Sequence, residues 1–318
     1  MKVFSAMLLV VVVLAVAGCA KVMGPYYLEQ EKYEEGVRVI GEQMREHPED
    51  ASAAYYVGRY TLALDKPKEA LPYLEKAVKL DPENADYVFW TGVAYWAMLD
   101  FDREKAAYEK ALRLDPNHIS ANLYLGHGYI DRGEWVKALA QYTTVLRLDP
   151  YNPEALYNKA MALNGLGRTD DAIAAWKKFL EYYPDGSLAM EATAQLNLRG
   201  NFDYRNFIIG KRNVTLKSMA FKPGTSVLEN DSKVSLHLIS AMMTVNKELT
   251  LHIVPFVKGN AALAKERAEV IRDYMLNANP GIQRSRLPLS WFKIAETIDM
   301  GDVKYSLDES VKFITEVR

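Results

Sequence analysis

The chain has 318 residues, which is enough for two domains of ordinary size. Apolar residues make up 49% and charged residues 25%, a balance typical of a soluble globular protein and not of a disordered one. The formal net charge of -2 argues against a dedicated nucleic-acid binder, and the single cysteine excludes an intramolecular disulfide.

Residues 1–18 are expected to form a signal peptide. Lys2 supplies a positive charge, and the apolar run 3–17 has the length of a signal-peptide core but is short for a membrane span. The run ends in Val16-Ala17-Gly18-Cys19, which resembles the bacterial lipobox. The resemblance implies cleavage before Cys19 and lipidation of its thiol, followed by an acylated linker over 19–29. Because Ala20 and not Asp follows, it also implies sorting to the outer membrane. The alternative is an ordinary signal peptide with an incidental cysteine.

A helical repeat region is predicted over 30–200. Prolines recur at a fixed interval of 34 residues, at Pro48, Pro82, Pro116, Pro150 and Pro184. This period is typical of helix–turn–helix repeats, which bury their apolar faces only by stacking on one another. Four full repeats are predicted over 51–186, with a half repeat over 31–47 before them and a capping helix over 187–198 after them.

Small and large residues recur inside the repeats. The eighth position holds Gly or Ala, so that paired helices can approach closely, and the twenty-fourth holds Leu74, Tyr108, Tyr142 or Trp176. This pattern resembles the tetratricopeptide repeat family, from which Glu104 departs at a position where the family has alanine. The resemblance implies a superhelical solenoid whose concave face, lined by the first helix of each pair, captures a protein segment.

The second, fifth, ninth and twelfth positions of each repeat are expected to face this groove. Aromatic rings supply contact area at a low cost in conformational entropy, with Arg and His as polar anchors. The predicted groove residues are Tyr55, Arg59, Phe89, Trp96, His127, Tyr157 and Met161. Aromatic residues and leucine at the fifth position favour an apolar or aromatic segment as the ligand. The alternative is that several of these side chains pack between neighbouring repeats.

After residue 200 the period ends, and we expect a linker over 201–212 and an α/β domain over 213–318. Alternating apolar residues predict strands over 213–220 and 249–253. Helical spacing predicts two helices, the first with an apolar face made by Val234, Leu238, Ala241, Met242 and Val245. Two closing strands are predicted near 287–291 and 311–313. The resulting βαβαββ order implies a small sandwich with two helices on one sheet face.

Two motifs carry a second resemblance. Phe221-Lys222-Pro223-Gly224-Thr225, and the helix from Asn260 through Arg267 to Ile271, resemble the OmpA-like, peptidoglycan-associated domain over 213–317. That family holds the diaminopimelate of peptidoglycan with an Asp for its ammonium and an Arg for its carboxylate. The candidate peptidoglycan-binding residues here are therefore Arg267, Asn260 and Lys258.

The candidate peptidoglycan-binding site departs from the family's pattern. Lys258 stands at the Asp position, and Asp308-Glu309-Ser310 replaces an Asn-Arg-Arg run. A cation at the Asp position would repel the ligand's ammonium. We therefore expect the fold to be kept and diaminopimelate binding to be weak or lost. Arg267 would then have a structural role, either capping a helix turn or pairing with Asp273 or Glu266.

No catalytic motif, metal-ligand spacing or cofactor-binding loop is recognisable in the sequence. The sequence predicts a non-enzymatic lipoprotein, anchored through Cys19 to the outer membrane and facing the periplasm. It would act as an adaptor in an envelope assembly, with a protein partner in its groove and the OmpA-like domain near the cell wall. One alternative is a peptidoglycan-binding tether. The other is a pilotin-like factor for a secretin or pilus.

Overall fold

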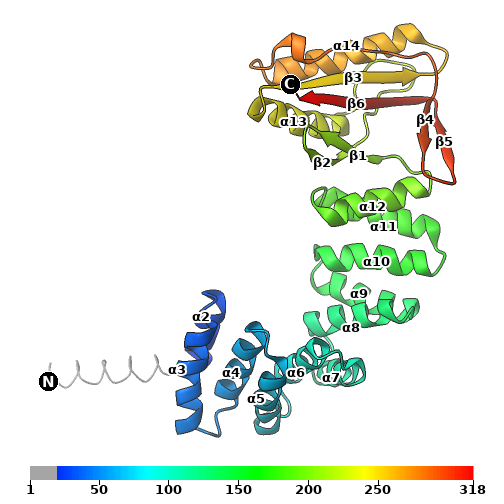
Figure 1. Cartoon of the computed structure of the whole chain (residues 1–318). Coiled ribbons are helices and arrows are strands. Elements are labelled where there is room, and N and C mark those ends of the chain that lie inside the picture. The colour runs from blue at the N-terminus through cyan, green and yellow to red at the C-terminus, as the bar shows by residue number, and fades with distance from the viewer. Residues whose placement is uncertain (1–19, 318) are drawn as a thin grey trace, which may run out of the picture. The chain divides into compact units, whose positions relative to one another are not determined.

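A computed structural model describes residues 20–317, so the predicted signal peptide and Cys19 lie outside the described part of the chain. Contacts between Cα atoms divide the chain after Leu166 into two units, and each unit is considered by itself. The first is helical, and the second combines helices with short antiparallel sheets (Figure 1).

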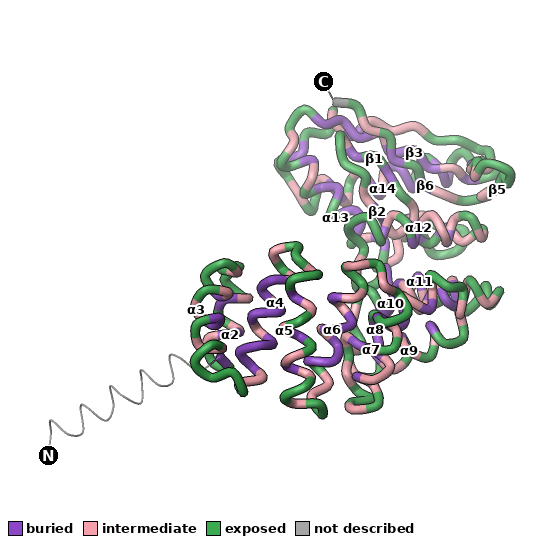
Figure 2. Tube along the Cα trace, turned by 60° about the horizontal axis from the view of Figure 1, so that its bottom comes forward, coloured by how far each residue is buried: buried purple, intermediate pink, exposed green. Residues whose placement is uncertain are grey.

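In the first unit, consecutive helices pack side by side, and buried positions recur along each of them between exposed ones (Figure 2). The four predicted repeats begin where the sequence pattern placed them. The helices are α2 (Ala20–Glu29), α3 (Tyr33–Glu46), α4 (Ala51–Ala63), α5 (Pro67–Leu80), α6 (Ala85–Ala97), α7 (Phe101–Leu114), α8 (Ile119–Asp131), α9 (Trp135–Leu148) and α10 (Pro153–Gly165).

Polar caps and small residues explain this regularity. The side chains of Asp50, Asn84 and Asn152 accept hydrogen bonds from backbone N–H groups in the first turns of α4, α6 and α10. A Cβ atom on Gly92 would lie 2.5 Å from Cε1 of Tyr108, so only glycine lets α6 and α7 approach this closely. The eighth and twenty-fourth positions of a repeat are therefore a packing pair.

The expected linker over 19–29 is helical in the structure, and this expectation was wrong. Helix α2 packs against α3 and α4, with Ala20 and Tyr27 buried. The hydroxyl of Tyr60 donates a hydrogen bond of 2.9 Å to the carbonyl of Gly24. Burial of these apolar residues stabilises the segment as a helix. Together α2 and α3 form a helical pair before the first full repeat.

Glu104 is buried at the position where the other repeats have alanine. Burial raises the pKa of its carboxyl group to about 7, and the nearby Arg132 only partly opposes the shift. When the carboxyl pKa is higher in the folded state than in the unfolded state, the group does not lower the free energy of unfolding at a pH below the unfolded-state pKa of about 4.3. As the pH rises above that value the destabilisation grows, and it is complete once the pH exceeds the folded-state pKa. Glu104→Gln should therefore raise the free energy of unfolding by about 1–3 kcal/mol at pH 8 and by much less at pH 4.5.

Urea unfolding at the two pH values measures this difference. Glu83→Gln, at an exposed position, is the matched control and should change little at either pH. An equal effect of Glu104→Gln at both pH values would contradict the assigned cost of burying the carboxylate.

The second unit begins with two helices and continues as an α/β domain. Its helix α12 coincides with the predicted capping helix. The elements are α11 (Thr169–Tyr182), α12 (Ser187–Leu198), β1 (Tyr204–Ile209), β2 (Arg212–Lys217), α13 (Asn230–Val245), β3 (Leu249–Val257), α14 (Ala261–Ala278), a 3-10 turn (Arg284–Arg286), β4 (Glu296–Asp299), β5 (Lys304–Leu307) and β6 (Glu309–Val317).

Strand β3 lies at the centre of this domain. It pairs antiparallel with β6 along its whole length, and residues 288–292 bridge to it in parallel through Leu289 and Phe292. The buried core is formed by Leu236 and Ile239 of α13 and Ile271 of α14 against the apolar side chains of β3 and β6. Strands β1 and β2 form an antiparallel hairpin, as do β4 and β5.

Several expectations for this unit were wrong. The expected linker over 201–212 contains β1, which pairs with β2, so the chain forms a hairpin where a single strand was predicted. The strand expected near 287–291 forms only bridges, and the hairpin β4–β5 was not predicted at all. Among the residues of the expected apolar face of α13, Val234, Leu238, Ala241 and Val245 are exposed, because Leu236, Ile239 and Met243 fill the core instead.

Candidate protein-binding face of the helical repeats

One face of the first unit gathers aromatic and charged side chains from α4, α6, α8 and α10, the first helix of each repeat. We call it the helix A face. Its sixth positions are Tyr56, Trp90, Tyr124 and Asn158, and its ninth positions include Arg59 and His127. All six side chains are partly or largely exposed, so they are available to a ligand.

The side chain of Arg59, on α4, stacks on a tryptophan ring of α6. Its guanidinium carbon lies 3.3 Å from the centroid of the Trp90 ring, and its Nη1 donates a hydrogen bond of 2.6 Å to the Tyr55 hydroxyl. Stacking of a guanidinium on tryptophan is a favourable cation–π contact, and it removes much of the conformational freedom of the arginine. Arg59 is thus a preorganised cation beside an aromatic surface.

The aromatic series continues along α8. The Tyr124 ring centroid lies 5.7 Å from that of Phe89 and 5.7 Å from that of His127. Burial lowers the pKa of His127, although Glu154 and Asp131 oppose the shift, so the imidazole is neutral at neutral pH. Its Nε2 lies 3.2 Å from Nδ2 of Asn158, which places a polar pair beside the aromatic rings.

The predicted groove residues divide into two groups. Arg59, His127 and Met161 are half-buried and Trp96 is 52% exposed. Tyr55, Phe89 and Tyr157 are buried, so their assignment as ligand contacts was wrong. The fifth position points toward the next helix: the ring centroids of Tyr55 and Tyr87 are 4.7 Å apart. The sixth position is more open than the fifth, with Tyr124 exposed and Tyr56 and Trp90 half-buried, and the recurrence of aromatic residues there was the signal that sequence reasoning missed.

In the second unit, the two cationic residues expected at the peptidoglycan-binding site, Arg267 and Lys258, already form ion pairs with acidic side chains of the same chain. Arg267 is only 2% exposed, and its Nη1 donates a 2.8 Å bond to Glu309 while its Nε donates to the Thr225 carbonyl. Lys258 pairs with Asp308 at 3.2 Å. The expected pairing of Arg267 with Asp273 or Glu266 was wrong, because Glu309 is the acid within reach.

Asn260 has a local structural role. Its Oδ1 accepts a hydrogen bond of 3.0 Å from the backbone N–H of Leu263 and so caps α14. Arg267 and Glu309 line a cleft of about 350 Å³ together with Phe221 and Ser310. In that cleft the arginine faces an internal carboxylate, so its charge is neutralised before any ligand arrives.

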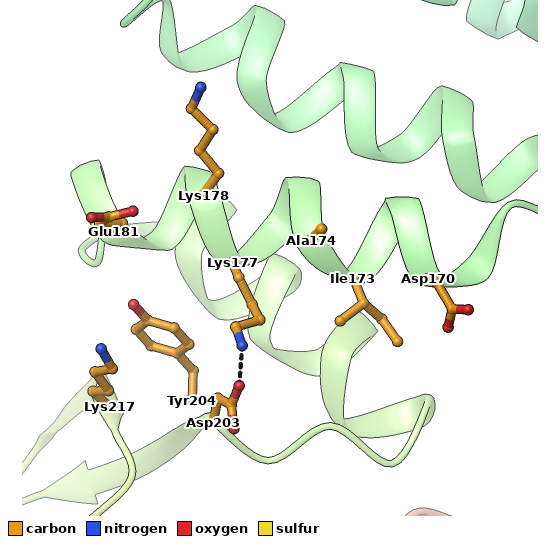
Figure 3. A pocket seen from close by; sticks show the side chains of 9 residues that line it. All are labelled: Asp170, Ile173, Ala174, Lys177, Lys178, Glu181, Asp203, Tyr204 and Lys217. Carbon is orange, nitrogen blue, oxygen red and sulfur yellow. Dashed lines mark ion pairs between the residues drawn. The ribbon is translucent and has the colours of Figure 1, made fainter.

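A larger cleft of about 680 Å³ lies along α11 and the start of the β1–β2 hairpin (Figure 3). Its charged residues are three acids and three lysines, and Lys177 pairs with Asp203 across it. Lys217 also has an acidic partner, Asp231. The balanced charges give this cleft no preference for an anion or a cation.

Models of the tetratricopeptide repeat match residues 58–119, 126–167 and 154–186. The chain contains tetratricopeptide repeats. Comparison with curated proteins finds no match. Among solved structures, the chain is similar in fold to YrrB, a "TPR protein with an unusual peptide-binding site", at 22% identity over 54% of this chain and 88% of that one, with a TM-score of 0.46.

Two other solved structures show a similar degree of likeness. TTC0263, a thermophilic TPR protein of Thermus thermophilus, is 24% identical over 55% of this chain and 96% of that one, with a TM-score of 0.44. MamA 41-end from Desulfovibrio magneticus RS-1 is 19% identical over 62% of this chain and 95% of that one, with a TM-score of 0.45.

No group of three or more His, Cys, Asp or Glu side chains in residues 20–317 is placed to hold a metal ion. In the same range, no helix has the length and apolarity needed to span a membrane. The side chains of the helix A face are suited to binding, with aromatic surface for contact and Arg59 and His127 for polar recognition.

Proposed function

We propose that the protein is a non-enzymatic adaptor whose tetratricopeptide repeats capture a segment of a partner protein on the helix A face. The observation that carries the proposal is the stacking of Arg59 on Trp90, together with the exposed ring of Tyr124, which like Trp90 lies against Phe89. Aromatic residues and arginine dominate protein-binding hot spots because they bury a large area with few rotatable bonds. The ligand that fits is an extended segment with an apolar or aromatic side chain and an acidic group for Arg59.

We propose further that Cys19 is acylated and anchors the protein to the outer membrane from the periplasmic side. The small residues Val16-Ala17-Gly18 before the cysteine support this. Expression with an alkyne-tagged fatty acid tests it, because wild type should be labelled and recovered with membranes. Cys19→Ser should lose both label and membrane association, whereas labelling that persists in this variant would contradict the anchor.

For the second unit, we propose an OmpA-like fold that has lost the family's ligand. Support for the fold comes from the order β2, α13, β3, α14, the bridge-forming segment 288–292 and β6, which contains the expected βαβαββ order. Support for the loss of ligand binding comes from two ion pairs within the chain, Arg267 with Glu309 and Lys258 with Asp308. An adaptor role near the wall is therefore favoured over a peptidoglycan tether.

Co-sedimentation with isolated peptidoglycan tests this distinction. We expect wild type to stay in the supernatant at physiological salt, while an OmpA-like domain with the family's Asp and Arg pellets as the positive control. Glu309→Gln removes the internal carboxylate from Arg267 without altering its size, and Lys258 should still prevent binding. If wild type pellets with peptidoglycan and free diaminopimelate returns it to the supernatant, the protein is a tether.

A further inference from the structure

Helix α2 begins at Ala20, so a single peptide bond joins it to Cys19, the proposed site of acylation. Consecutive Cα atoms lie about 3.8 Å apart across a trans peptide bond. In the acylated protein, no stretch of chain separates the lipid-bearing residue from the first helix of the fold. The start of α2 is therefore held at the surface of the bilayer.

Helix α2 is a fixed part of the first unit. A Cβ atom on Gly24 would overlap the ring of Tyr56, and the Tyr60 hydroxyl donates its 2.9 Å hydrogen bond to the carbonyl of the same glycine. Ala20, Gly24 and Tyr27 are buried on the side of α2 that packs against α3 and α4. Because this side is occupied, only the opposite side of α2 is free to contact lipid.

The opposite side of α2 carries apolar and aromatic groups near its start. Val22 is 51% and Tyr26 41% exposed, and a spacing of four positions places them on one face. Lys21 is exposed next to Val22, and the Lys32 ammonium donates a hydrogen bond of 3.2 Å to the Tyr26 hydroxyl. Tyrosine and lysine suit the boundary between lipid and water, because each has an apolar body and a polar tip.

We propose that Val22 and Tyr26 lie in the headgroup layer of the membrane that holds the acyl chains, with Lys21 and Lys32 beside the lipid phosphates. We call these four residues the α2 membrane face. The proposal rests on the proposed acylation of Cys19 and adds to it a protein surface that contacts lipid. Val22 follows Cys19 by three residues and so lies within about 11 Å of it. The headgroup layer of one leaflet is about 5–8 Å thick, which brings Val22 within its reach.

Acidic residues limit this contact to the first two turns of α2. Glu29 follows Tyr26 by three positions on the same side of the helix, and Glu31 comes after its end; both are exposed. A carboxylate is costly to remove from water and is repelled by anionic lipids. Residues 20–32 contain two lysines and two glutamates, so no net charge attracts this segment to a membrane. The contact therefore depends on the acyl anchor.

Photo-cross-linking to lipid tests the proposal. The full chain, acylated in cells, is reconstituted into vesicles of phosphatidylethanolamine and phosphatidylglycerol that contain an alkyne-tagged phospholipid. A photoreactive phenylalanine replaces Tyr26 or, as the matched control, Tyr151, a tyrosine of the same unit that is 57% exposed. We expect about fivefold or more lipid adduct at position 26 than at position 151, because only the first side chain lies among the headgroups.

Further variants separate the surface from the anchor. Val22→Glu should lower the adduct yield at position 26 about threefold while the protein still floats with the vesicles, because it places a carboxylate on the α2 membrane face. Val136→Glu, at a valine of α9 that is 70% exposed, should leave that yield unchanged. The chain from position 19 with Cys19→Ser keeps every element that the structure describes, and it should give no adduct above the control.

The inference and the anchor can fail separately. Acylated protein that floats with the vesicles but gives equal adducts at positions 26 and 151 would overturn the α2 membrane face and leave the anchor in place. A mature chain whose mass shows no acyl group would overturn the anchor, and this inference with it. Neither result bears on the helix A face, so capture of a partner segment is judged separately.

Discussion

Replacing Trp90 by alanine is expected to weaken peptide binding by the tetratricopeptide repeats about thirtyfold, equivalent to about 2 kcal/mol. The substitution removes the aromatic ring whose centroid lies 3.3 Å from the Arg59 guanidinium carbon. The contact and the preorganisation of the cation are therefore lost together. The probe is a peptide selected from a displayed random library on the wild-type protein, and calorimetric titration gives its affinity.

Two controls separate binding from folding. Val136→Ala, on a second helix of a repeat, should leave the affinity unchanged, and the melting temperature of Trp90→Ala shows whether the first unit stays folded. Arg59→Lys keeps the charge but lacks the planar group that stacks on Trp90, so it should weaken binding of an acidic peptide. If the selected peptides bind Trp90→Ala as tightly as wild type, the helix A face is not the binding site.

Arg205→Met is expected to lower the free energy of unfolding of the second unit by about 3–5 kcal/mol. Arg205 lies on β1, and its two terminal nitrogens each donate a 2.8 Å bond to one carboxylate oxygen of the buried Glu296. The Ser310 hydroxyl donates a further 2.7 Å bond to the same group. Without the arginine, a buried carboxylate remains with one weak partner, and that is the source of the large cost.

The pH dependence of this pair has a definite sign. Burial by itself would raise the pKa of Glu296, but the hydrogen bonds from Arg205 and Ser310 outweigh it and hold the pKa below its usual value. A lowered carboxyl pKa stabilises the fold above the unfolded value, and the stabilisation is lost as the pH falls through the folded value. In Arg205→Met burial raises the pKa of the unpaired Glu296 above its usual value, so the cost of the substitution should begin to shrink as the pH falls through that raised pKa and keep shrinking toward acid pH.

A double-mutant cycle with Glu296→Leu measures the coupling. The double variant Arg205→Met, Glu296→Leu should recover most of the lost stability, because it removes both charges and fills the volume with apolar atoms. A cost below about 1 kcal/mol for Arg205→Met alone would place the pair among ordinary surface ion pairs.

The helical repeats were predictable because their signals are local and periodic. Prolines recur every 34 residues, and each repeat has a small residue at its eighth position and a large one at its twenty-fourth, so the starts of α4, α6, α8 and α10 followed from the sequence. The sequence did not reveal which of two adjacent positions in each first helix lies on the helix A face. A shift of one residue rotates a helical side chain by about 100°, so exchanging the fifth position for the sixth exchanges the buried Phe89 for the half-buried Trp90.

The second unit was predicted less well, for two physical reasons. Helix α13 has apolar residues on both faces, so spacing alone could not tell Leu236 and Met243 in the core from Val234 and Val245 at the surface. The pairing of Arg267 with Glu309 joins positions 42 apart in the sequence, and only the tertiary fold brings the two together. Lys258 and Asp308 were each recognised as departures from the family's pattern, but their pairing was not predicted.

The central claim is that the helix A face captures a partner protein in the cell envelope. Photo-cross-linking in cells that express the protein natively tests it most directly, with a photoreactive phenylalanine at Tyr124 and the same residue at Val136 as the matched control. The proposal predicts one discrete protein adduct at position 124 that disappears when Trp90→Ala is added. An adduct pattern that is the same at positions 124 and 136, or that persists with Trp90→Ala, would contradict it.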